Sequence, residues 1–350
     1  MNRNQLKDRI VLEEERILNT YGTDYGDDDR EPWDIDLYCK NIKFEIISVS
    51  ERGYSLEFDL KNVEAPFANA LRRILLAEVP SVAIEKVFLY QNTSLIPDEI
   101  FAHRIGLVPI KADPRLFVER VFSTDGIDEV TDGSADDTLM FELKVKCVKN
   151  PQMQKEAKDS TTDPNDLYLH HNVYSKDLVW IPIGDQAERF QFDPPRPVVG
   201  DILLAKLRPG QEIELRCHCV KGIGRDHAKF SPVATASYRL LPEIILKDTI
   251  KGEAAERLKE SFSNGVIELV EDRDGVQKAV VKDARRDMCS RNVFRHADLA
   301  DKVLLTRHRR HFIFSVESTG ALTAAELVVE ACKVMQQKCN TMLSELAKFV

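Results

Sequence analysis

The stretch EAPFANALRRILLAEVP, residues 64–80, carries the strongest signal for the fold. Pro66 suits the first turn of a helix, and Pro80 ends one because its ring cannot continue the backbone hydrogen bonding. Between the prolines, Arg72 and Arg73 lie beside a stripe of apolar side chains at helical spacing: Phe67, Ala70, Leu71, Ile74 and Leu75. The pattern predicts an amphipathic helix that buries one face.

Strand-like runs lie on both sides of this helix in the chain. FEIISV (44–49) and YSLEFDL (54–60) are joined by a turn at residues 50–53. In the second run apolar and polar residues alternate, which predicts a strand with one buried and one polar face. Further strands are expected at 233–246 and 311–318, whereas residues 120–138 and 150–166 have the composition of surface loops.

The C-terminal residues predict a long helix. Thr323 and Glu326 form a capping box, with Leu322 and Leu327 at the staple positions. Apolar residues then recur every 3.5 positions on average, at Val328, Cys332, Met335, Cys339, Met342, Leu346 and Phe349. Such a seam fits another helix. Packing on its own domain explains it equally well, but a helix of roughly 27 residues spans about 40 Å, so part of the seam is available to a partner chain.

The composition is that of an ordinary globular protein, with 350 residues and a net charge of −9. A protein that binds nucleic acid with most of its surface is usually basic, so any such contact must be local or supplied by partners. Seven acids and one Arg in residues 21–36 indicate a solvated or adaptable arm. We expect no membrane span or signal peptide, because no apolar run reaches 18 residues.

Seven cysteines form neither a disulfide framework nor a metal motif. Cys147, Cys217 and Cys219 continue the apolar face of two predicted strands, so each is interpreted as a small inward-facing residue. A structural zinc site needs four ligands, usually in two close pairs, and no CxxC is present. We therefore expect neither metal nor cofactor.

The segment KGIGRDHAKFSP, residues 221–232, is the best candidate for catalysis. Gly222 and Gly224 could cradle a phosphate, and Asp226 with His227 could transfer protons, which would make the chain a nucleotide-binding enzyme. However, a dinucleotide loop needs a third glycine and a following helix, and Ser231-Pro232 prevents that helix. The alternative is an interface loop whose glycines let the backbone turn tightly.

Two further clusters are interpreted as surface features. The basic patch TRHRRH, residues 306–311, could bind a phosphate backbone through Arg307, Arg309 and Arg310, or act as an import signal. In an acidic protein a solvated or partner-facing surface is the preferred interpretation. The pair His170-His171 has no carboxylate or Cys in ligand register.

Several of these stretches resemble the α-like subunit family of cellular RNA polymerases. The resemblance rests on FANALRRILLAEVPSVAIEKV (67–87), NTSLIPDEIFAHRIGLVPI (92–110), YSKDL (174–178), LRPGQEIEL (207–215), GIGRDHAKFSPVA (222–234) and FIFSVESTGAL (312–322). The loop HAKFSPVATASY, the acidic N-terminal extension and the long segment 251–310 favour the large α-like subunits shared by RNA polymerases I and III over the polymerase II counterpart. Neither the cysteine-rich zinc loop nor the iron–sulfur region of some relatives has its cysteines here.

The resemblance implies an α+β fold like that of the bacterial α-subunit N-terminal domain. After an acidic extension (1–41), a discontinuous dimerisation domain would comprise residues 42–84 and 235–350. A strand-rich insertion domain (85–234) would interrupt it. The second part of the dimerisation domain would hold the charged segment 251–310 and the strand and long helix of 311–350.

The resemblance also implies a non-catalytic nuclear and nucleolar subunit that transcribes no RNA by itself. It would pair with a smaller α-like subunit, and the pair would hold the two large catalytic subunits and small zinc-binding subunits. The implied heterodimer residues are Phe67, Ala70, Leu71, Ile74, Leu75, Val328, Cys332, Met335, Cys339, Met342 and Leu346. The implied contacts to other polymerase subunits are Arg72, Arg73, Gly222, Gly224, Asp226, His227, Lys229 and Phe230. The equivalent polymerase II subunit is the alternative within the family.

Overall fold

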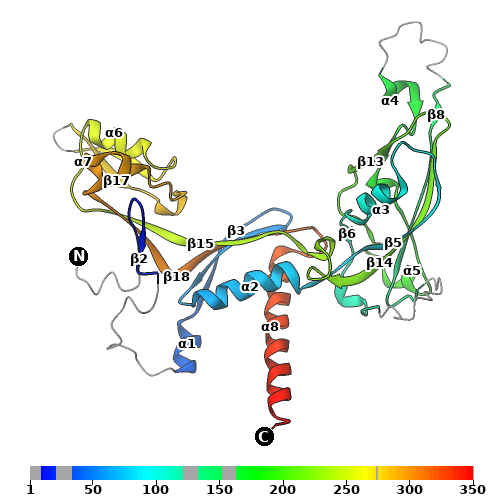
Figure 1. The fold of residues 1–350 in the computed structure, drawn as a ribbon, viewed down its shortest axis with the longest axis horizontal. Helices are drawn as coiled ribbons and strands as arrows, with labels where there is room; N and C mark the ends of the chain where they lie inside the picture. Colours follow the sequence, from blue (N-terminus) through cyan, green and yellow to red (C-terminus); the bar gives the residue numbers. More distant parts are fainter. Residues whose placement is uncertain (1–8, 21–33, 121–132, 152–162, 273–274, 350) are drawn as a thin grey trace. The chain divides into compact units, whose positions relative to one another are not determined.

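The computed structural model describes residues 9–20, 34–120, 133–151, 163–272 and 275–349. The chain divides into two compact units. Unit 1 comprises Met1–Ser48, Glu57–Ala70 and Ser237–Ser315, and unit 2 comprises Val49–Leu56, Leu71–Ala236 and Val316–Val350. Both units contain helices and sheets, which confirms the α+β class (Figure 1).

Unit 1 is built on a six-stranded sheet in the order β2-β1-β18-β4-β3, with β15 also paired to β18. The strands are β1 (Arg9–Leu12), β2 (Ile17–Leu18), β3 (Lys43–Val49), β4 (Ser55–Lys61), β15 (Val233–Leu246) and β18 (Val303–Ser318). The predicted hairpin at 44–60 and the strand at 233–246 are confirmed. The last strand is longer than expected, because it begins at Val303 and includes the basic patch. The short helix α1 (Ile35–Asn41) precedes β3.

The charged segment 251–310, up to the start of β18 at Val303, folds into a small body within unit 1, and its core also includes Leu12 and Ile244. It contains α6 (Glu253–Glu260), β16 (Ile267–Glu271), β17 (Gln277–Val281), the 3-10 turns η8 (Ala284–Arg286) and η9 (Asn292–Arg295), and α7 (Ala297–Ala300). Ala255, Leu258, Val293 and Leu299 are fully buried there. These residues are far apart in the sequence, and the fold brings them together in one buried cluster.

Unit 2 is built on an antiparallel sheet in the order β11-β7-β14-β5. These strands are β5 (Pro80–Asn92), β7 (Leu139–Lys146), β11 (Val179–Ile181) and β14 (Glu212–Ile223). Shorter paired strands are β6 (Ile110–Lys111) with β12 (Arg196–Pro197), β8 (Val148–Lys149) with β9 (Tyr168–Leu169), and β10 (Asn172–Tyr174) with β13 (Leu203–Lys206). Short helical segments connect them: α3 (Asp98–Gly106), η4 (Pro114–Leu116), α4 (Pro164–Leu167), η6 (Ser175–Asp177), α5 (Gln186–Arg189) and η7 (Ala228–Phe230).

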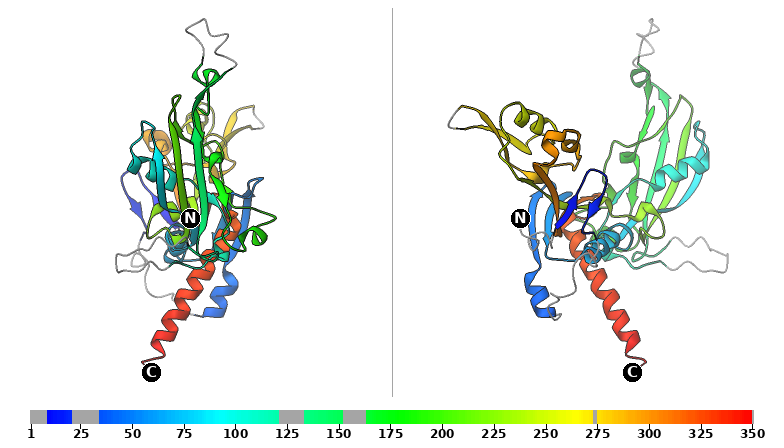
Figure 2. Two further views of the ribbon diagram at one scale, coloured as in Figure 1. Left: turned by 90° about the vertical axis from the view of Figure 1, so that its right-hand side faces the viewer. Right: turned by 60° about the vertical axis from the view of Figure 1, so that its left-hand side comes forward.

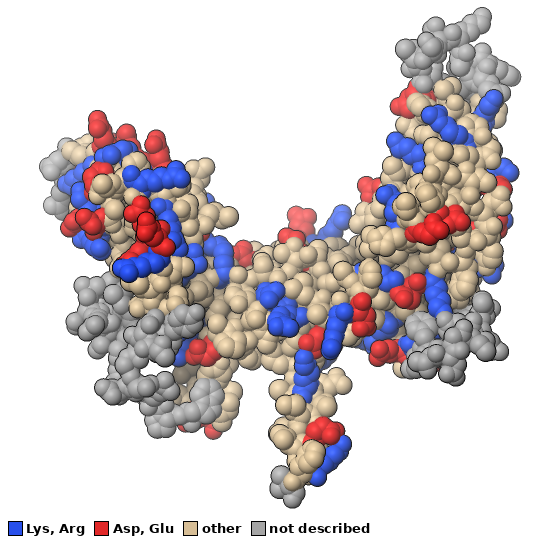
Figure 3. Space-filling view, in the orientation of Figure 1, with Lys and Arg blue, Asp and Glu red and all other residues tan. Residues whose placement is uncertain are grey.

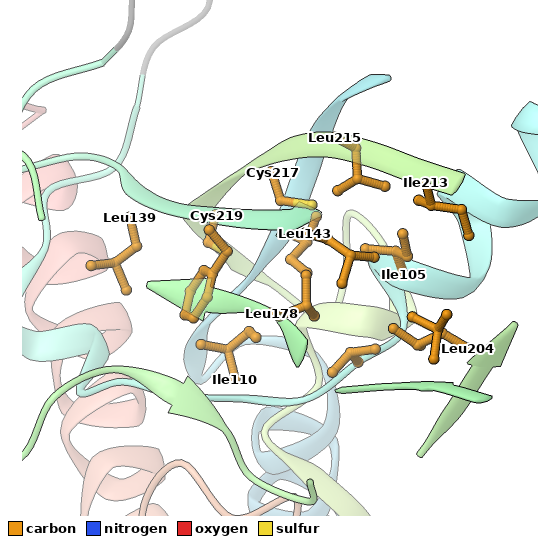
Figure 4. Close-up of a cluster of buried hydrophobic side chains, with 14 of the residues drawn as sticks. Ile105, Ile110, Leu139, Leu143, Leu178, Leu204, Ile213, Leu215, Cys217 and Cys219 are labelled. Atoms are coloured by element: carbon orange, nitrogen blue, oxygen red, sulfur yellow. The ribbon is translucent and has the colours of Figure 1, made fainter. Parts of the chain in front are cut away.

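The core of unit 2 uses cysteine as an apolar residue. Cys217 and Cys219 of β14 lie among Leu143, Leu178 and Ile110, as Figure 4 shows, and both are buried. Cys147 is also fully buried. The inward orientation predicted for these three cysteines is confirmed, because alternate strand residues face the same side of the sheet.

Two helices carry the predicted apolar stripes. α2 (Ala65–Ala77) follows β4, and α8 (Ala324–Leu346) ends the chain. α8 has 23 residues and ends at Leu346, so it is somewhat shorter than the helix expected from the sequence. Its predicted capping box is confirmed: the Glu326 N–H donates to Thr323 Oγ1 (3.3 Å), and the Thr323 N–H donates to Glu326 Oε2 (3.0 Å).

Candidate assembly interface

The first turns of α8 are anchored within unit 2. Ala324, Leu327, Val328 and Ala331 are buried. Arg115 lies 3.3 Å from Glu326 and also binds Asp113, so the cation holds the start of the helix to the η4 segment. The N-terminal part of the apolar seam, Val328 included, is therefore occupied by the protein itself.

From Cys332 onward α8 loses this cover. Met335 is half-buried, whereas Cys332, Cys339, Met342 and Leu346 are exposed. Met342 has 66% of its surface accessible and Leu346 58%. Figure 2 shows these turns, in red, extending away from the remaining elements of unit 2. A helix that exposes methionine and leucine at heptad spacing has the apolar stripe of one helix of a coiled coil.

The α2 stripe divides between the interior and the surface. Leu71, Ile74 and Leu75 are buried in this chain, while Phe67 is 38% exposed and Ala70 is half-buried. The three large aliphatic residues already pack inside this chain. Of the five residues expected to face a partner, only Phe67 and Ala70 therefore have accessible surface. Arg73 is exposed and Arg72 is half-buried with a polar partner.

The glycines of the 222–230 loop serve close packing. A Cβ at Gly222 would lie 2.8 Å from the Phe230 ring, and one at Gly224 would collide with the carbonyl oxygen of Leu76. Neither glycine has a positive φ, but Gly224 lies in a tight turn that is closed by the hydrogen bond from the Asp226 N–H to the Ile223 carbonyl (3.0 Å). The Arg225 N–H donates to the Ala77 carbonyl (2.9 Å), which fixes the loop against the end of α2. A backbone packed in this way leaves no cradle for a phosphate.

The side chains of this loop have separate roles. Phe230 is buried, and its carbonyl accepts a hydrogen bond from Ser81 Oγ (2.6 Å). Lys229 forms an ion pair with Glu85 (2.5 Å). His227 Nδ1 accepts the Lys229 N–H (3.1 Å) and so caps η7. Asp226 and His227 are exposed, and no hydrogen bond between their side chains is found. The proton-transfer pair considered from the sequence is not assembled.

A hollow of about 240 Å³ lies beside this loop. His227 and Lys229 form one wall, and His103 and Leu107 at the end of α3 contribute to another. Leu107 is 51% exposed. A concave site with an apolar residue and polar neighbours is suited to one inserted side chain of a protein partner.

The sequence interpretation missed two sets of exposed apolar residues. β3 is an edge strand, and all of its residues are exposed. Four of them are apolar: Phe44, Ile46, Ile47 and Val49. On α8, Val329 and Leu343 add to the exposed surface. The signal was present in FEIISV, since a run with apolar residues on both faces needs cover on both faces. Unpaired edges of this kind are sites for pairing with another chain.

A buried ionic network joins three segments of unit 1. Asp59 of β4 is 4% exposed, contrary to the polar face expected there. Arg285 donates to Asp59 Oδ1 (2.7 Å) and to Glu57 (2.6 Å), and the His311 ring lies 2.8 Å from Asp59 Oδ2. Burial by itself would raise the pKa of Asp59, but the hydrogen bonds and charges of His311 and Arg285 outweigh it and lower that pKa. The network ties η8 of the 251–310 segment to β4.

The basic patch at 306–311 is part of this sheet. Arg310 pairs with Glu64 (2.8 Å), and His308 lies 3.6 Å from Glu243. Arg307 and Arg309 are half-buried. These residues are built into β18 and its neighbours, so they do not form a loose basic segment.

The cysteine thiols in the core of unit 2 stay protonated at neutral pH and are poor nucleophiles. Burial raises the pKa of the Cys217 thiol to about 12 and raises that of Cys219 as well.

Throughout the described ranges, no three His, Cys, Asp or Glu residues are grouped so that they could hold a metal ion. Within the same ranges no helix has the length and apolarity needed to cross a membrane.

Comparisons with known proteins agree on one family. Residues 57–339 match the model of the RNA polymerase Rpb3/Rpb11 dimerisation domain. The chain is 52% identical to the DNA-directed RNA polymerases I and III subunit RPAC1 of Bos taurus, over 98% of this chain and 96% of the relative. It is 46% identical to the subunit of the same name from Saccharomyces cerevisiae, over 95% and 96%. Identity to the Arabidopsis thaliana subunit 3 of RNA polymerases II, IV and V is 32%, over 81% and 85%. The chain therefore belongs to the α-like subunit family of DNA-directed RNA polymerases, characterised by the Rpb3/Rpb11 dimerisation domain.

Proposed function

We propose that this chain is a non-catalytic assembly subunit shared by RNA polymerases I and III. It pairs with a smaller α-like subunit, and the pair forms the platform on which the two large catalytic subunits assemble for rRNA, 5S rRNA and tRNA synthesis. The relatives named for polymerases I and III are 39–52% identical to it over nearly their whole length, whereas relatives from other polymerases are near 30%. A nuclear and nucleolar location follows from that role.

The observation that carries the proposal is the exposed second half of α8. Val328 to Ala331 mark the end of its internal packing, and the seam continues for four more turns into solvent. Burying one Met or Leu side chain contributes roughly 1.5–3 kcal/mol, so Met335, Met342 and Leu346 together can hold a tight heterodimer. Phe67 and Ala70 of α2 are also proposed to contact the smaller subunit, and the buried Leu71, Ile74 and Leu75 to hold α2 in place.

The domain arrangement is also part of the proposal. Residues 42–84 and 235–350 are proposed to act as one discontinuous dimerisation domain, with 85–234 inserted between them. The family match beginning at residue 57 and ending at 339 supports this, because it spans both outer parts.

Contacts with the other polymerase subunits are proposed at the 222–230 loop and at Arg72 and Arg73. Asp226, His227 and Arg73 are exposed, and the hollow beside His227 offers a concave site for a partner side chain. Gly222, Gly224, Lys229 and Phe230 are proposed to shape this surface. The partners are the second-largest and largest subunits and the small zinc-binding subunits.

The decisive experiment places a carboxylate in the seam. Met335→Asp and Met342→Asp, in a tagged chain expressed in eukaryotic cells, should abolish recovery of the smaller α-like subunit, because the buried carboxylate would lack a counter-charge. The large subunits should be lost with it, since they dock on the heterodimer. Lys333→Asp is the matched control, because Lys333 is exposed off the seam.

Recovery of the small partner at wild-type levels by both seam variants would refute the proposal. Mass spectrometry of the wild-type pull-down tests the choice of polymerase. Large subunits of polymerases I and III are expected, and those of polymerase II alone would favour the alternative.

A further inference from the structure

A polar hollow of about 520 Å³ lies at the β9–β10 end of unit 2. Five of its lining residues occupy alternate positions along residues 168–176: Tyr168, His170, Asn172, Tyr174 and Lys176. Tyr168 ends up beside the hollow from β9, His170 from the turn that follows it, Asn172 and Tyr174 from β10, and Lys176 from η6. Asn165, His171 and Asp177 complete the wall. Two phenol rings, two imidazoles, two amides, one ammonium group and one carboxylate therefore surround one space.

Cations lie over the aromatic rings. The Lys176 ammonium is 5.4 Å from the ring centre of Tyr174, and the Arg208 guanidinium is 5.9 Å from that of Tyr168. Lys206 of β13 lies opposite Asn172 in the strand pairing. At this end of the unit, Figure 3 shows Lys and Arg side chains on the surface, together with Asp and Glu side chains. These cations are placed to meet the phosphate of a nucleotide whose base lies against a tyrosine ring.

The acidic neighbours of the hollow are engaged in local structure. Asp177 Oδ2 accepts the Tyr174 N–H (2.7 Å). Asp163 caps α4 by accepting the Asn165 N–H (2.9 Å). Each carboxylate thus has a backbone donor but keeps its negative charge, so an incoming ligand meets both these carboxylates and the cations of Lys176, Lys206 and Arg208.

His170 is held in a strained conformation. Its φ is 59°, the left-handed region that favours glycine, and its side chain is exposed. The adjacent His171 has a structural partner, since its Nδ1 lies 2.6 Å from the Leu207 carbonyl. Strain of about 1–3 kcal/mol in a non-glycine residue is often retained at binding sites. The His170 imidazole is exposed, so it is accessible to a ligand in the hollow.

We propose that this hollow binds a single-stranded nucleic acid segment by stacking an unpaired base against Tyr168 or Tyr174. Stacking platforms flanked by cations are the general means of binding single strands, because every base has a π-face and every nucleotide a phosphate. Paired bases would not be accessible for such stacking. An acidic peptide would use the cations but would leave the phenol and imidazole faces without a role.

Fluorescence anisotropy with a labelled single-stranded RNA of twelve nucleotides and the full-length chain tests the proposal. The wild type should bind with a Kd of about 10⁻⁵ M or below at moderate salt. Tyr168→Ala and Tyr174→Ala should each weaken binding about 5- to 100-fold, whereas Tyr174→Phe should retain it. Lys176→Ala should reduce the salt dependence by about one unit of slope. Tyr90→Ala, an exposed tyrosine on another strand, is the control.

His170→Gly separates a binding role from a structural one. Glycine adopts the left-handed conformation without strain, so the melting temperature should hold or rise while RNA binding weakens. A variant that is more stable and binds equally well would show that His170 only forms a turn.

Three results would overturn the proposal: wild-type affinity weaker than about 10⁻⁴ M, equal binding by both alanine variants, or equal competition by duplex RNA or polyglutamate. Polyglutamate competition would indicate a protein partner instead. All of these variants should still recover the smaller α-like subunit, so the outcome is independent of the assembly proposal.

Discussion

The α-carbon of Gly224 packs directly against the carbonyl oxygen of Leu76, with no space for a Cβ between them. This contact seats the 222–230 loop on the end of α2, and the neighbouring Arg225–Ala77 hydrogen bond holds the same approach. A glycine is required here because of the close approach, since its backbone conformation is open to any residue.

Gly224→Ala should lower the free energy of unfolding by about 1–3 kcal/mol, because the backbone must move to accommodate the methyl group. Gly200→Ala is the matched control, since its Cβ would make an ordinary 3.4 Å contact with Lys176. Trp180 lies in unit 2, and in a Trp33→Phe background its fluorescence during urea unfolding reports on that unit. Equal stability of the two alanine variants would contradict the packing role.

Asp59→Asn should destabilise the protein in a pH-dependent way. The pKa of Asp59 is lowered in the folded state, so its carboxylate contributes stability above its ordinary pKa, and this is lost as the pH falls through the folded value. The difference in unfolding free energy from wild type should be about 3 kcal/mol at pH 7. It should narrow below about pH 5.

Thermal melts of both proteins across this pH range measure the effect. Asp298→Asn is the control, because its ion pair with Arg257 is about half exposed and should contribute little. A constant difference between wild type and Asp59→Asn down to the lowest pH at which both fold would rule out the ionic contribution.

Asp226→Ala combined with His227→Ala should leave stability nearly unchanged, because both side chains are exposed. We expect weaker or unchanged recovery of the large polymerase subunits, and no effect on any reaction of the isolated chain. Nucleotide hydrolysis assays on purified wild-type and double-variant protein provide the check. A turnover that is present in the wild type and absent from the variant would establish the enzyme alternative.

Thiol labelling can locate the heterodimer surface without mutation. In the isolated chain Cys39 and Cys339 are exposed and should react rapidly, whereas Cys217 should react only after unfolding because burial raises its pKa to about 12. When the smaller α-like subunit is added, Cys339 should become protected because it lies in the seam. Mass spectrometry of the labelled peptides measures each site, and unchanged labelling of Cys339 in the purified heterodimer would place the interface elsewhere.

Local features of this fold could be predicted from the sequence because they depend on neighbouring residues. The capping box of Thr323 and Glu326 and the alternation that turns Cys217 inward both act over a few positions. The 3.5-residue repeat of α8 likewise predicted a seam, and Met342 on that seam is exposed as a docking surface would be.

Long-range contacts were decided only by the tertiary structure. Asp59 is buried because Arg285, distant in the chain, provides its counter-charge, and no local pattern encodes that pair. Gly224 is needed because the fold brings Leu76 against it. The same holds for α2, where periodicity identified an apolar stripe, but burial of Leu71 and exposure of Phe67 depend on which elements the chain folds onto each side of the helix. Periodicity specifies a face, and topology specifies what covers it.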